Sequence, residues 1–499
     1  MKKIVLGILL CAGIGILQSQ NDVDAFRFSQ IQQRLGTARF MGAGGAFGAI
    51  GADYSAILVN PGAIGVYKQD EISLTPLAIS ALNSYSQYMG ETSRDQRVRY
   101  CLPQVGGVFA FKTPETSDMK YIQFAFGCNR IQDFNQSFRI NGKSPLTSLQ
   151  SEYLSALNGN TPDYWYSNNL SPFEANALFL YDHYWLDTVP GTSMHQYFSY
   201  MDSVPTQQAG HVITKGNITE IDFSLGGNYN DKLFFGVSVG IPVLDYSAQI
   251  SYSETDIDNE LTIDSYAHDE WLEVKGTGLN LKAGVIYRPV SFLRLGLSLH
   301  TPTYYLSLTD KSSRSVSLYR DADSPDENGF TEYHNNEGSE EVVNLFKYRL
   351  TTPMRAIGSV GFLIAKRAFI DVDYEWADYN TMFLNSTSYQ FSMENKNIDE
   401  KYRSTHTIRV GGEVFVSKSV VLRAGYNVTT SAFKKSVDNN SLYQQASAGI
   451  GFRSKSFFFD LAYSFAWYKD NYWMYSTQLQ PVENQFTAQR VIASVGFKF

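Results

Sequence analysis

The stretch FFFDLAYSFAWY, residues 457–468, alternates between two kinds of side chain. One face carries only large apolar groups, at Phe457, Phe459, Leu461, Tyr463, Phe465 and Trp467. The opposite face carries an acidic group and small groups, at Asp460, Ala462, Ser464 and Ala466. Successive side chains of a β-strand point to opposite sides, so this period of two predicts a strand with different surroundings on its two faces. A continuous face of bulky apolar groups is typical of contact with lipid.

The same alternation recurs along the chain after residue 68. It is clear in FLRLGLSLH (292–300), in SVVLRAGYNV (419–428) and in the final residues 490–499. All such segments together predict strands near residues 70–79, 99–112, 119–131, 215–230, 232–250, 270–288, 291–309, 346–365, 367–379, 403–416, 419–433, 442–454, 456–469 and 486–499. Bacterial single-chain outer-membrane barrels have an even number of strands. We therefore predict an all-β fold, a transmembrane antiparallel β-barrel of about fourteen strands.

The predicted connections alternate in length. Short turns fall at PETSD (114–118), YNDK (229–232), YRPVS (287–291), AKRA (365–368), VSKS (416–419) and RSKS (453–456). Longer loops lie between them, including 132–214, 310–345 and 380–402. A barrel with short periplasmic turns and long outer loops requires this alternation. Its parity predicts that both chain ends lie in the periplasm.

Composition and charge agree with such a barrel. The chain has 33 Tyr and 33 Phe, and its net charge of -8 argues against nucleic acid as a partner. A Lys or Arg that faces lipid at the bilayer midplane costs roughly 2–4 kcal/mol, so charged strand residues are expected to face the lumen. The predicted lumen face carries Asp222, Lys282, Arg294, Asp371, Asp373, Glu375, Arg409, Glu413, Arg423 and Asp460.

The N-terminus, MKKIVLGILLCAGIGILQSQ, has two lysines before an apolar run that ends at Leu17. This pattern predicts a secretory signal peptide over residues 1–19, because the run is too short to span a membrane as a helix. Cleavage would leave Cys101 and Cys128 as the cysteines of the exported protein. A disulfide between them stays open, since the predicted strands do not place them opposite each other.

The longest loop, 132–214, contains two segments with helical character, LTSLQSEYLSALNG (146–159) and SPFEANALFLYDHYWLD (171–187). Its aromatic content makes disorder improbable. Two interpretations of the aromatic residues stay open: they form the core of a partly helical loop subdomain, or they line a groove that captures ligand. The residues concerned are Tyr164, Trp165, Tyr166, Phe173, Phe179, Tyr184 and Trp185.

The glycine-rich run GAGGAFGAIGADYSAILVNPGAIG, residues 42–65, resembles a phosphate-binding loop only superficially. Phe47 stands where G-x-G-x-x-G requires its third glycine, and no Gly-Lys-Ser/Thr follows. Glycine and alanine allow one backbone to approach another closely. The run is therefore better explained as a segment that packs inside a barrel.

Catalytic and metal motifs are weak. GVSVG (236–240) matches G-x-S-x-G, but it lies within an alternating strand and no helix follows it. The histidines are scattered, although His183 and His195 in the long loop leave a haem or metal ligand as an alternative. We predict a protein that is not an enzyme and has no cofactor and no metal site.

Several segments together resemble the FadL/TodX (OmpP1) family of outer-membrane transporters of hydrophobic compounds. They are DYSAILVNPGAIG (53–65), YRPVSFLRLGLSLHTP (287–302), TPMRAIGSVGF (352–362) and KSVVLRAGYNVT (418–429). The resemblance implies a fourteen-strand barrel over residues 69–499 and an N-terminal hatch, or plug, over residues 20–68. Asn60 and Pro61 match the family's Asn-Pro, whereas Gly62 stands where the family commonly has Ala.

The resemblance also implies a path for a ligand. Hydrophobic molecules would be caught at the outer loops and bound near the hatch, for which the candidate residues are Phe26, Phe28, Ile31, Leu35, Phe40, Met41 and Phe47. They would leave sideways into the membrane beside a kinked strand, with Gly127 as the gate candidate. Pro103 and Pro242 are alternative kink positions, because proline removes a hydrogen bond from the ladder.

The function predicted on this basis is passive uptake of long-chain fatty acids or similar apolar or aromatic compounds. The protein would be a monomer in the outer membrane of a Gram-negative cell, in contact with lipid and lipopolysaccharide. The barrel assembly machinery would be its partner during folding. The alternatives are a surface barrel that transports nothing, such as an adhesin or structural protein, and a receptor for a haem-type ligand.

Overall fold

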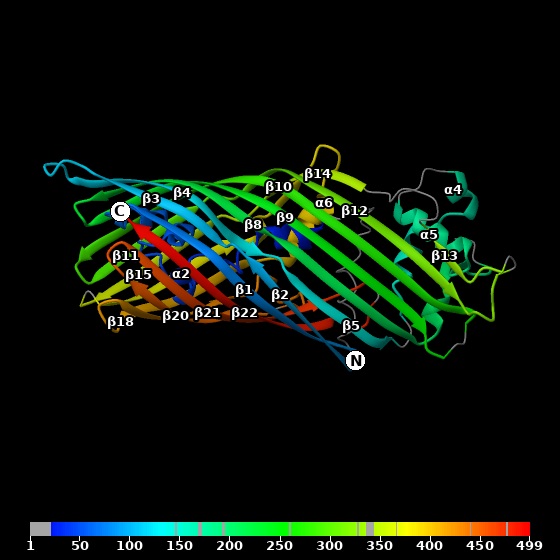
Figure 1. The fold of residues 1–499 in the computed structure, drawn as a ribbon. Coiled ribbons are helices and arrows are strands. Elements are labelled where there is room, and N and C mark those ends of the chain that lie inside the picture. The colour runs from blue at the N-terminus through cyan, green and yellow to red at the C-terminus, as the bar shows by residue number, and fades with distance from the viewer. Residues whose placement is uncertain are drawn as a thin grey trace, which may run out of the picture.

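The computed structural model describes residues 21–499 apart from 145–146, 168–171, 192–194, 259–260, 327–328, 336–343, 366, 440 and 476–477. The predicted signal peptide, with Cys11, lies outside the described residues. The chain forms a closed antiparallel β-barrel of fourteen strands with an N-terminal segment inside it (Figure 1). The first and last strands close the barrel, with Glu71 paired to Lys498 at one end of their shared ladder.

Several barrel strands consist of two pieces. In chain order the barrel strands are β1 (Glu71–Tyr88), β2 (Glu91–Cys101) with β3 (Gln104–Lys112), β4 (Met119–Asp133) with β5 (Gln136–Ser144), β8 (Thr206–Tyr229), β9 (Leu233–Asp256), β10 (Ile263–Val290), β11 (Leu293–His300) with β12 (Tyr304–Arg320), β14 (Asn344–Thr351) with β15 (Arg355–Ile364), β16 (Ala368–Asp378) with β17 (Phe383–Asn385), β18 (Ser404–Phe415), β19 (Val420–Thr429), β20 (Tyr443–Arg453), β21 (Phe457–Tyr472) and β22 (Val482–Lys498). Three of the interruptions fall at prolines, Pro103, Pro302 and Pro353, which have no N–H to donate to the ladder.

The predicted number of strands is confirmed, but two regions differ from the prediction. β1 and β2 form one long hairpin, joined by a two-residue turn at Met89 and Gly90 with φ of 48° and 84°. The predicted strands near 70–79 and 99–112 therefore omitted about half of each strand. The predicted loop 132–214 is also shorter, because β5 continues to Ser144 and β8 begins at Thr206.

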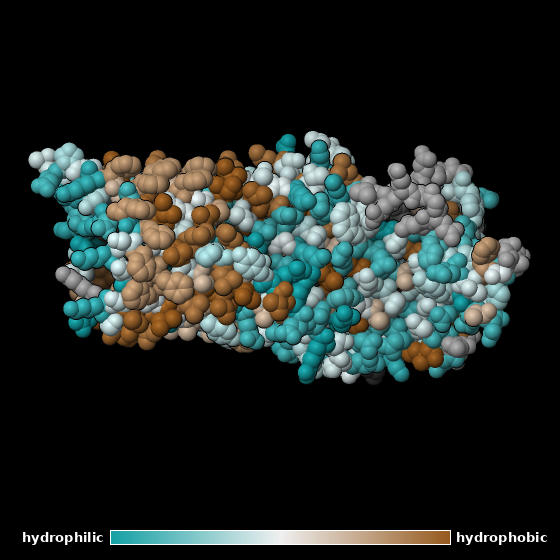
Figure 2. All heavy atoms as spheres, viewed as in Figure 1, coloured by the Kyte–Doolittle hydropathy of each residue, from teal (hydrophilic) through white to brown (hydrophobic). Residues whose placement is uncertain are grey.

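On the face that Figure 2 shows, a hydrophobic band covers the half of the barrel that carries the short turns. Its outward-facing side chains include Phe109, Phe124 and Leu225, which are 38%, 38% and 56% exposed. The adjoining half of the surface is mostly hydrophilic. Spanning a membrane takes about 9–11 residues of a tilted strand, whereas β10 has 28 residues. The barrel therefore extends well beyond the band.

The N-terminal segment, residues 21–68, is called here the plug segment. It contains α1 (Asp22–Ser29), α2 (Ala38–Gly42) and the 3₁₀ turns η1 (Tyr54–Leu58) and η2 (Pro61–Val66). Polar side chains start these elements: Asn21 accepts a hydrogen bond from the Asp24 amide, and Thr37 accepts one from the Phe40 amide. Almost every residue from 35 to 65 is buried.

The segment between β5 and β8, residues 147–205, is called here the cap. It contains α3 (Ser151–Leu157), α4 (Pro162–Ser167), α5 (Pro172–Asp182), β6 (Leu186–Thr188), β7 (Tyr197–Ser199) and η3 (Tyr200–Ser203). The cap lies at the end of the barrel away from the hydrophobic band (Figure 1). Its core contains Trp165 and Trp185, which pack in one cluster with Tyr252 and Tyr266 of the barrel wall.

The remaining elements are β13 (Glu332–His334), η4 (Tyr379–Thr381) and α6 (Ser392–Lys401). α6 contacts α1, and the Lys401 ammonium lies 3.1 Å from the Asp22 carboxylate. None of the helices in the described residues is both long and apolar enough to cross a membrane.

Candidate functional site

The plug segment lies against the barrel wall with almost no space between the two backbones. A Cβ placed on Gly411 would come within 2.0 Å of the Ala43 carbonyl oxygen, and one on Gly425 within 2.2 Å of the Ala43 carbonyl carbon. Gly44 has a φ of +66° and lies beside Tyr426, so it combines a left-handed conformation with close packing. The glycines of this run serve backbone packing, as the sequence indicated.

Carboxylates of the wall accept hydrogen bonds from amides of the plug segment. Asp373 accepts from the amides of Phe47 and Gly48, at 3.2 and 3.1 Å, and Asp371 accepts from the amide of Ala49 at 3.2 Å. Both carboxylates lie on β16 and are fully buried. The charged lumen face predicted from the sequence therefore binds the plug segment directly.

The Asn-Pro turn of the plug segment is fixed in the same way. The Asn60 side chain donates to the carbonyls of Gly48 and Val285, at 2.7 and 3.0 Å, and accepts from the Gly62 amide at 2.9 Å. It thus links two parts of the plug segment to β10. Pro61 begins η2, and β1 starts ten residues later at Glu71.

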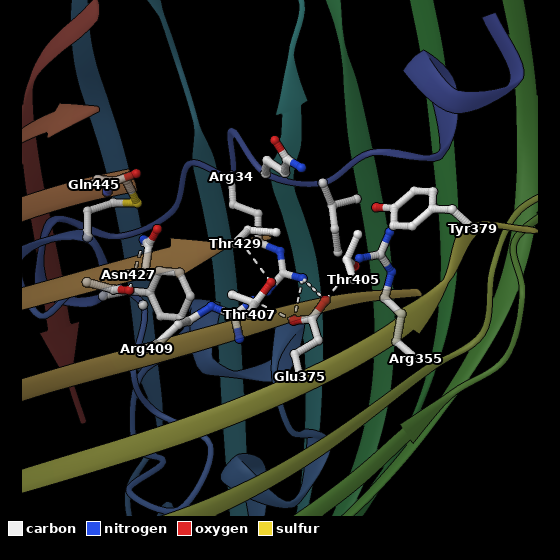
Figure 3. A pocket seen from close by; sticks show the side chains of 16 residues that line it. Arg34, Arg355, Glu375, Tyr379, Thr405, Thr407, Arg409, Asn427, Thr429 and Gln445 are labelled. Atoms are coloured by element: carbon white, nitrogen blue, oxygen red, sulfur yellow. Dashed lines mark hydrogen bonds and ion pairs between the residues drawn. The ribbon is translucent and has the colours of Figure 1, made fainter. Parts of the chain in front are cut away.

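Three arginines surround one carboxylate where the plug segment crosses the lumen (Figure 3). Arg34 of the plug segment donates to both oxygens of Glu375, at 3.2 and 3.1 Å. Arg355 donates to the same carboxylate at 2.9 Å, and Arg409 also forms an ion pair with it. Burial and the charges of Arg409 and Arg355 together lower the pKa of Arg34 to about 10, against the opposing effect of the Glu375 carboxylate. These groups line a cavity of about 40 Å³.

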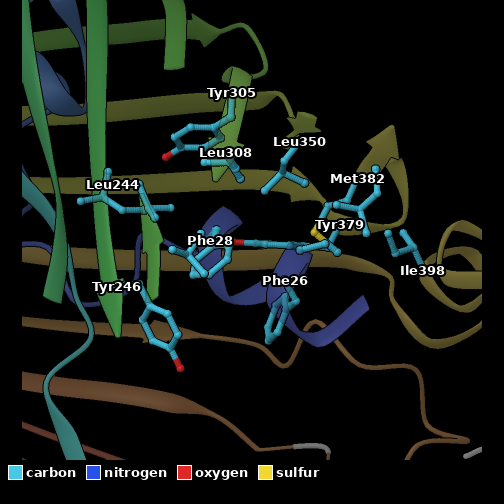
Figure 4. Close-up of a cluster of buried hydrophobic side chains, with 14 of the residues drawn as sticks. Phe26, Phe28, Leu244, Tyr246, Tyr305, Leu308, Leu350, Tyr379, Met382 and Ile398 are labelled. Atoms are coloured by element: carbon cyan, nitrogen blue, oxygen red, sulfur yellow. The ribbon is translucent and has the colours of Figure 1, made fainter. Parts of the chain in front are cut away.

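A large apolar cluster fills the lumen around α1 (Figure 4). Phe28 packs edge-on against Phe134 and Tyr246, with ring centroids 5.9 and 5.3 Å apart. Phe26 packs against Tyr379 and Tyr402 at 5.3 and 5.0 Å. The two phenylalanines of one short helix therefore occupy an apolar space that the barrel walls enclose.

A second cavity, of about 330 Å³, lies between the cap and the barrel wall. Its lining includes apolar groups such as Val212 and Met474 and an ionic group in which Arg314 lies 3.1 Å from Glu270. Tyr472 also lines this cavity. A space of this size lies within the range of pockets that hold small molecules.

One pair of neighbouring strands has no ladder over half of its length. Within the described residues, β2 pairs only with β1, and β5 pairs only with β8, although β2 and β5 lie in contact. We call this interruption the seam. Side chains cross it instead: the Asn141 side-chain amide of β5 donates to the Glu91 carboxylate of β2, and Asp95 of β2 reaches past β5 to His211 of β8, with 3.0 Å between His211 Nε2 and Asp95 Oδ2. The seam starts where β3 and β4 cease to be paired, next to Pro103.

The plug segment occupies the inner side of this interruption. The Leu35 amide donates to the Arg130 carbonyl at 2.9 Å, and the Gln33 amide donates to the Gln132 side chain at 3.1 Å. Both wall residues belong to β4, beyond its ladder with β3. The plug segment therefore satisfies backbone and side-chain groups that a neighbouring strand would otherwise bind.

The predicted hatch residues divide between two clusters. Phe26 and Phe28 lie in the apolar cluster around α1, and Ile31 packs against it. A separate buried cluster contains the remaining four, which are Leu35, Phe40, Met41 and Phe47. Ile31, Phe40 and Met41 also line the cavity beside Arg34.

Of the predicted capture residues of the cap, none whose side chain the structure describes lines the larger cavity. Trp165 and Trp185 are 2% and 0% exposed, whereas Tyr164, Tyr166 and Tyr184 are largely exposed. Phe179 packs partly buried against the core of the cap, and the side chain of Phe173 lies outside the described residues. Both tryptophans therefore lie where they would if the aromatic residues form the core of the loop subdomain.

The gate candidate Gly127 lies inside a continuous ladder, paired with Gly106 on one side and Asp222 on the other. A Cβ there would meet the Tyr54 hydroxyl at 2.5 Å. Of the alternative kink positions, Pro103 lies next to the seam, whereas Pro242 stays paired with Glu220.

The remaining chemical candidates are dispersed. Cys101 and Cys128 are both free thiols. The His183 ring is tilted against that of Tyr333, with ring centroids 4.3 Å apart, and its Nδ1–H donates a hydrogen bond to the Phe179 carbonyl at 2.8 Å. Within the described residues, no group of three or more His, Cys, Asp or Glu side chains could hold a metal ion.

The architecture of the barrel and its N-terminal segment is shared with solved structures. A Pseudomonas aeruginosa FadL homologue superposes with a TM-score of 0.57 and 14% identity, covering 93% of this chain and 98% of that chain. The chain has the fold of FadL and TodX. The P. putida toluene transporter TodX superposes with a TM-score of 0.51 and 11% identity, covering 94% and 99% of the two chains. No protein-family profile matches the sequence, and no curated protein matches it.

Three features of this FadL-type barrel were not predicted from the sequence. They are the seam between β2 and β5, the arginine group that includes Arg34 and Arg355, and the Gln33 contacts with the wall. The only signal in the polar strand ETSRDQRVRY (91–100) is its high content of charged residues, and it lacks the apolar face by which the other strands were found.

Proposed function

We propose that the chain is a non-enzymatic outer-membrane channel for passive uptake of hydrophobic molecules. The hydrophobic band, the apolar cluster inside the lumen and the FadL-type fold support this function. The toluene transport named for TodX adds weight, although it is that protein's own activity. The main observation behind the proposal is that the seam, where β2 and β5 form no backbone ladder, lies beside a buried apolar cluster.

The proposed path begins below the cap. A hydrophobic molecule first occupies the cavity of about 330 Å³, whose apolar lining includes Val212 and Met474. It then replaces the side chains of Phe26 and Phe28 in the apolar cluster around α1. Each CH₂ moved out of water contributes about 0.8 kcal/mol, so an alkyl chain of several carbons can compensate for the displaced phenylalanines.

The exit is proposed at the seam. Phe134, which packs against Phe28, belongs to the turn between β4 and β5. On the outer side of the seam, Val98, Tyr100 and Leu102 are 62%, 66% and 48% exposed and form an apolar approach from the membrane. A molecule that leaves here enters lipid without crossing the charged lumen. The gate role predicted for Gly127 is accordingly proposed for the neighbouring seam.

The absence of a ladder lowers the cost of opening. An unsatisfied backbone group in lipid costs several kcal/mol, so separating two fully paired strands in a membrane is prohibitive. Between β2 and β5 the described contacts are side-chain ones, such as that between Glu91 and Asn141. These can be exchanged for water or for headgroup contacts, because a side-chain hydrogen bond of this kind contributes only about 0.5–3 kcal/mol net.

The orientation and environment follow from the same proposal. The short turns lie at the same end of the barrel as its first and last residues, Glu71 and Lys498. We place this end in the periplasm, so that the cap faces outward. We propose a monomer that contacts lipid and lipopolysaccharide and that the barrel assembly machinery inserts. The residues 20–68 would act as the hatch, and residues 1–19 would be removed on export.

Mass spectrometry of hydrophobic molecules that co-purify with the barrel tests the binding step. Uptake of labelled fatty acids and of toluene by cells that produce the protein tests transport, with deletion of residues 21–30 as the variant. We expect the deletion to change the uptake rate and to release bound ligand. Uptake by the full chain no faster than by cells without it would contradict the proposal and favour a barrel that transports nothing.

A further inference from the structure

We propose that the cavity between Arg34, Arg355 and Arg409 binds a small anion, a halide or a carboxylate group, which links the plug segment to the barrel wall. The inference goes beyond uptake and does not depend on it, since anion binding is measured on the purified protein. Three guanidinium groups share the single carboxylate of Glu375.

The excess positive charge of the three arginines is buried. The three arginines are 8%, 9% and 7% exposed. Asp373 faces Arg409 across the β16–β18 ladder, but its oxygens already accept the amides of Phe47 and Gly48. Even with Asp373 included, three cations face two anions. Uncompensated charge away from water is strongly unfavourable, so a bound anion would relieve an electrostatic penalty.

Two donors of the group are free to bind such an anion. Within the described residues, Nη1 of Arg34 and Nη1 of Arg409 are buried and have no hydrogen-bond partner. Both side chains line the cavity. A buried donor without a partner is unfavourable, and more so when it is charged. Guanidinium N–H groups suit halide and carboxylate acceptors.

The lining of the cavity is compatible with this ligand. Neutral hydrogen-bonding side chains complete it on the barrel side, including Thr407 and Asn427, and Glu375 is its single acidic group. About 10–15 Å³ of such space holds one water molecule. A cavity of about 40 Å³ therefore accommodates a small anion or one carboxylate group, but not a whole apolar molecule.

The two sides of the site belong to different parts of the fold. Arg34 lies on the plug segment, whereas Arg355 and Arg409 lie on β15 and β18 of the wall. An anion held between them would therefore stabilise the docked plug segment. Its loss would leave three guanidinium groups sharing the single carboxylate of Glu375 and would favour release of the part of the plug segment that contains Gln33 and Leu35.

Bromide is the probe for the direct test. Crystals of the full-length protein grown in sodium bromide should show an anomalous difference peak between Arg34 and Arg409. In detergent solution, bromide should slow proteolytic cleavage within residues 21–35 at least about fivefold, with saturation. The variant Arg34→Gln should lose the peak and raise the half-saturating bromide concentration at least tenfold.

Arg39→Gln is the matched control. Arg39 is also a plug arginine paired with a wall carboxylate, but its three nitrogens already donate to Glu413 and to the Ala52 carbonyl. This variant should be cleaved faster than the wild type and should keep the bromide response. An equal bromide response in the wild type and Arg34→Gln, with no peak in the cavity, would overturn the proposal.

Octanoate and 1-octanol distinguish the sources of the anion. Displacement of bromide by octanoate but not by 1-octanol assigns the site to the carboxylate of an amphipathic ligand. Retention of bromide in both assigns it to an inorganic anion. Either result supports the anion site, and failure of uptake by the full chain would leave it standing.

Discussion

Arg490 on β22 donates a 2.6 Å hydrogen bond to the side-chain oxygen of Gln33 in the plug segment. Arg490 is 1% exposed, and no carboxylate of the described residues forms an ion pair with it. The Gln33 side chain also donates to the Tyr468 hydroxyl at 3.2 Å, and its amide binds Gln132. One neutral residue therefore connects three barrel strands to the plug segment and solvates a buried charge.

Replacement of Gln33 by leucine should loosen the plug segment. The change leaves the Arg490 guanidinium with one partner fewer, at a cost of about 1–3 kcal/mol. We expect proteolysis within residues 21–35 to accelerate by about 5- to 150-fold, while the heat-modifiable gel shift of the folded barrel persists. Gln30→Leu is the control, because the Gln30 side chain has no hydrogen bond in the described part of the chain. Equal acceleration in both variants would show that Gln33 has no special role.

A disulfide across the seam should block the proposed exit. Asp95 and Ser137 face each other there through a side-chain hydrogen bond. In a background with Cys101 and Cys128 replaced by alanine, the pair Asp95→Cys and Ser137→Cys should cross-link under oxidation and stop uptake. Reduction should restore it, since the barrel itself is unchanged.

The matched cross-link joins two strands that are already paired. Ala209 and Ser253 are directly opposite in the β8–β9 ladder. A disulfide at Ala209→Cys and Ser253→Cys should leave uptake within about twofold of the reduced protein. If the seam cross-link also leaves uptake unchanged, the exit lies elsewhere.

An added methyl group in the wall should displace the plug segment without disturbing the ladder. Gly411→Ala would place a Cβ 2.0 Å from the Ala43 carbonyl oxygen, and overpacking of this kind costs about 1–3 kcal/mol. Gly358→Ala is the control, because nothing lies within 4 Å of its Cβ position. Hydrogen exchange of residues 38–48 should accelerate in the first variant alone. Wild-type exchange in Gly411→Ala would contradict the close packing described above.

The docking of α1 should depend on pH. Burial raises the pKa of Asp24 to about 6 from 3.8, so the docked helix favours the neutral carboxyl. Docking is therefore strongest below about pH 4 and weakens as the pH rises through 6. A shift of this size corresponds to at most about 3 kcal/mol. A spin label at Val23, in the alanine background for the native cysteines, should become more mobile between pH 4 and pH 7.5.

Asp24→Asn should remove this dependence, because the amide does not titrate. Arg27, which forms an ion pair with Asp24, stays charged over the whole range. An identical pH response of the label in Asp24→Asn would assign the change to another group.

The strands that lie in the hydrophobic band were predictable, and those beyond it were only partly so. Contact with lipid demands a continuous apolar face, which is why residues 457–468 and 292–300 could be identified. Outside the band both faces of a strand meet water or polar groups. Over residues 91–97 β2 carries polar residues on both faces, and β5 shows only a short apolar alternation at Phe138 and Ile140, so neither was identified as a strand.

The charged residues of the lumen were predictable as a class, but their partners were not. The cost of a charge in lipid places Glu375 and Arg409 inside the barrel from sequence alone. Which arginine reaches which carboxylate depends on the register of strands far apart in the chain. The position of Arg34 depends further on the path of the plug segment, which has no periodic pattern from which to derive it.

The contact of Ala43 with Gly411 and Gly425 has a consequence for biogenesis. With the cap across one end and backbones touching along the wall, a finished barrel leaves no route by which residues 21–68 could thread into place. We therefore expect the plug segment to be enclosed as the sheet curls, and the ladder between β1 and β22 to form last. The order of assembly is then imposed by steric exclusion rather than by the relative stability of the parts.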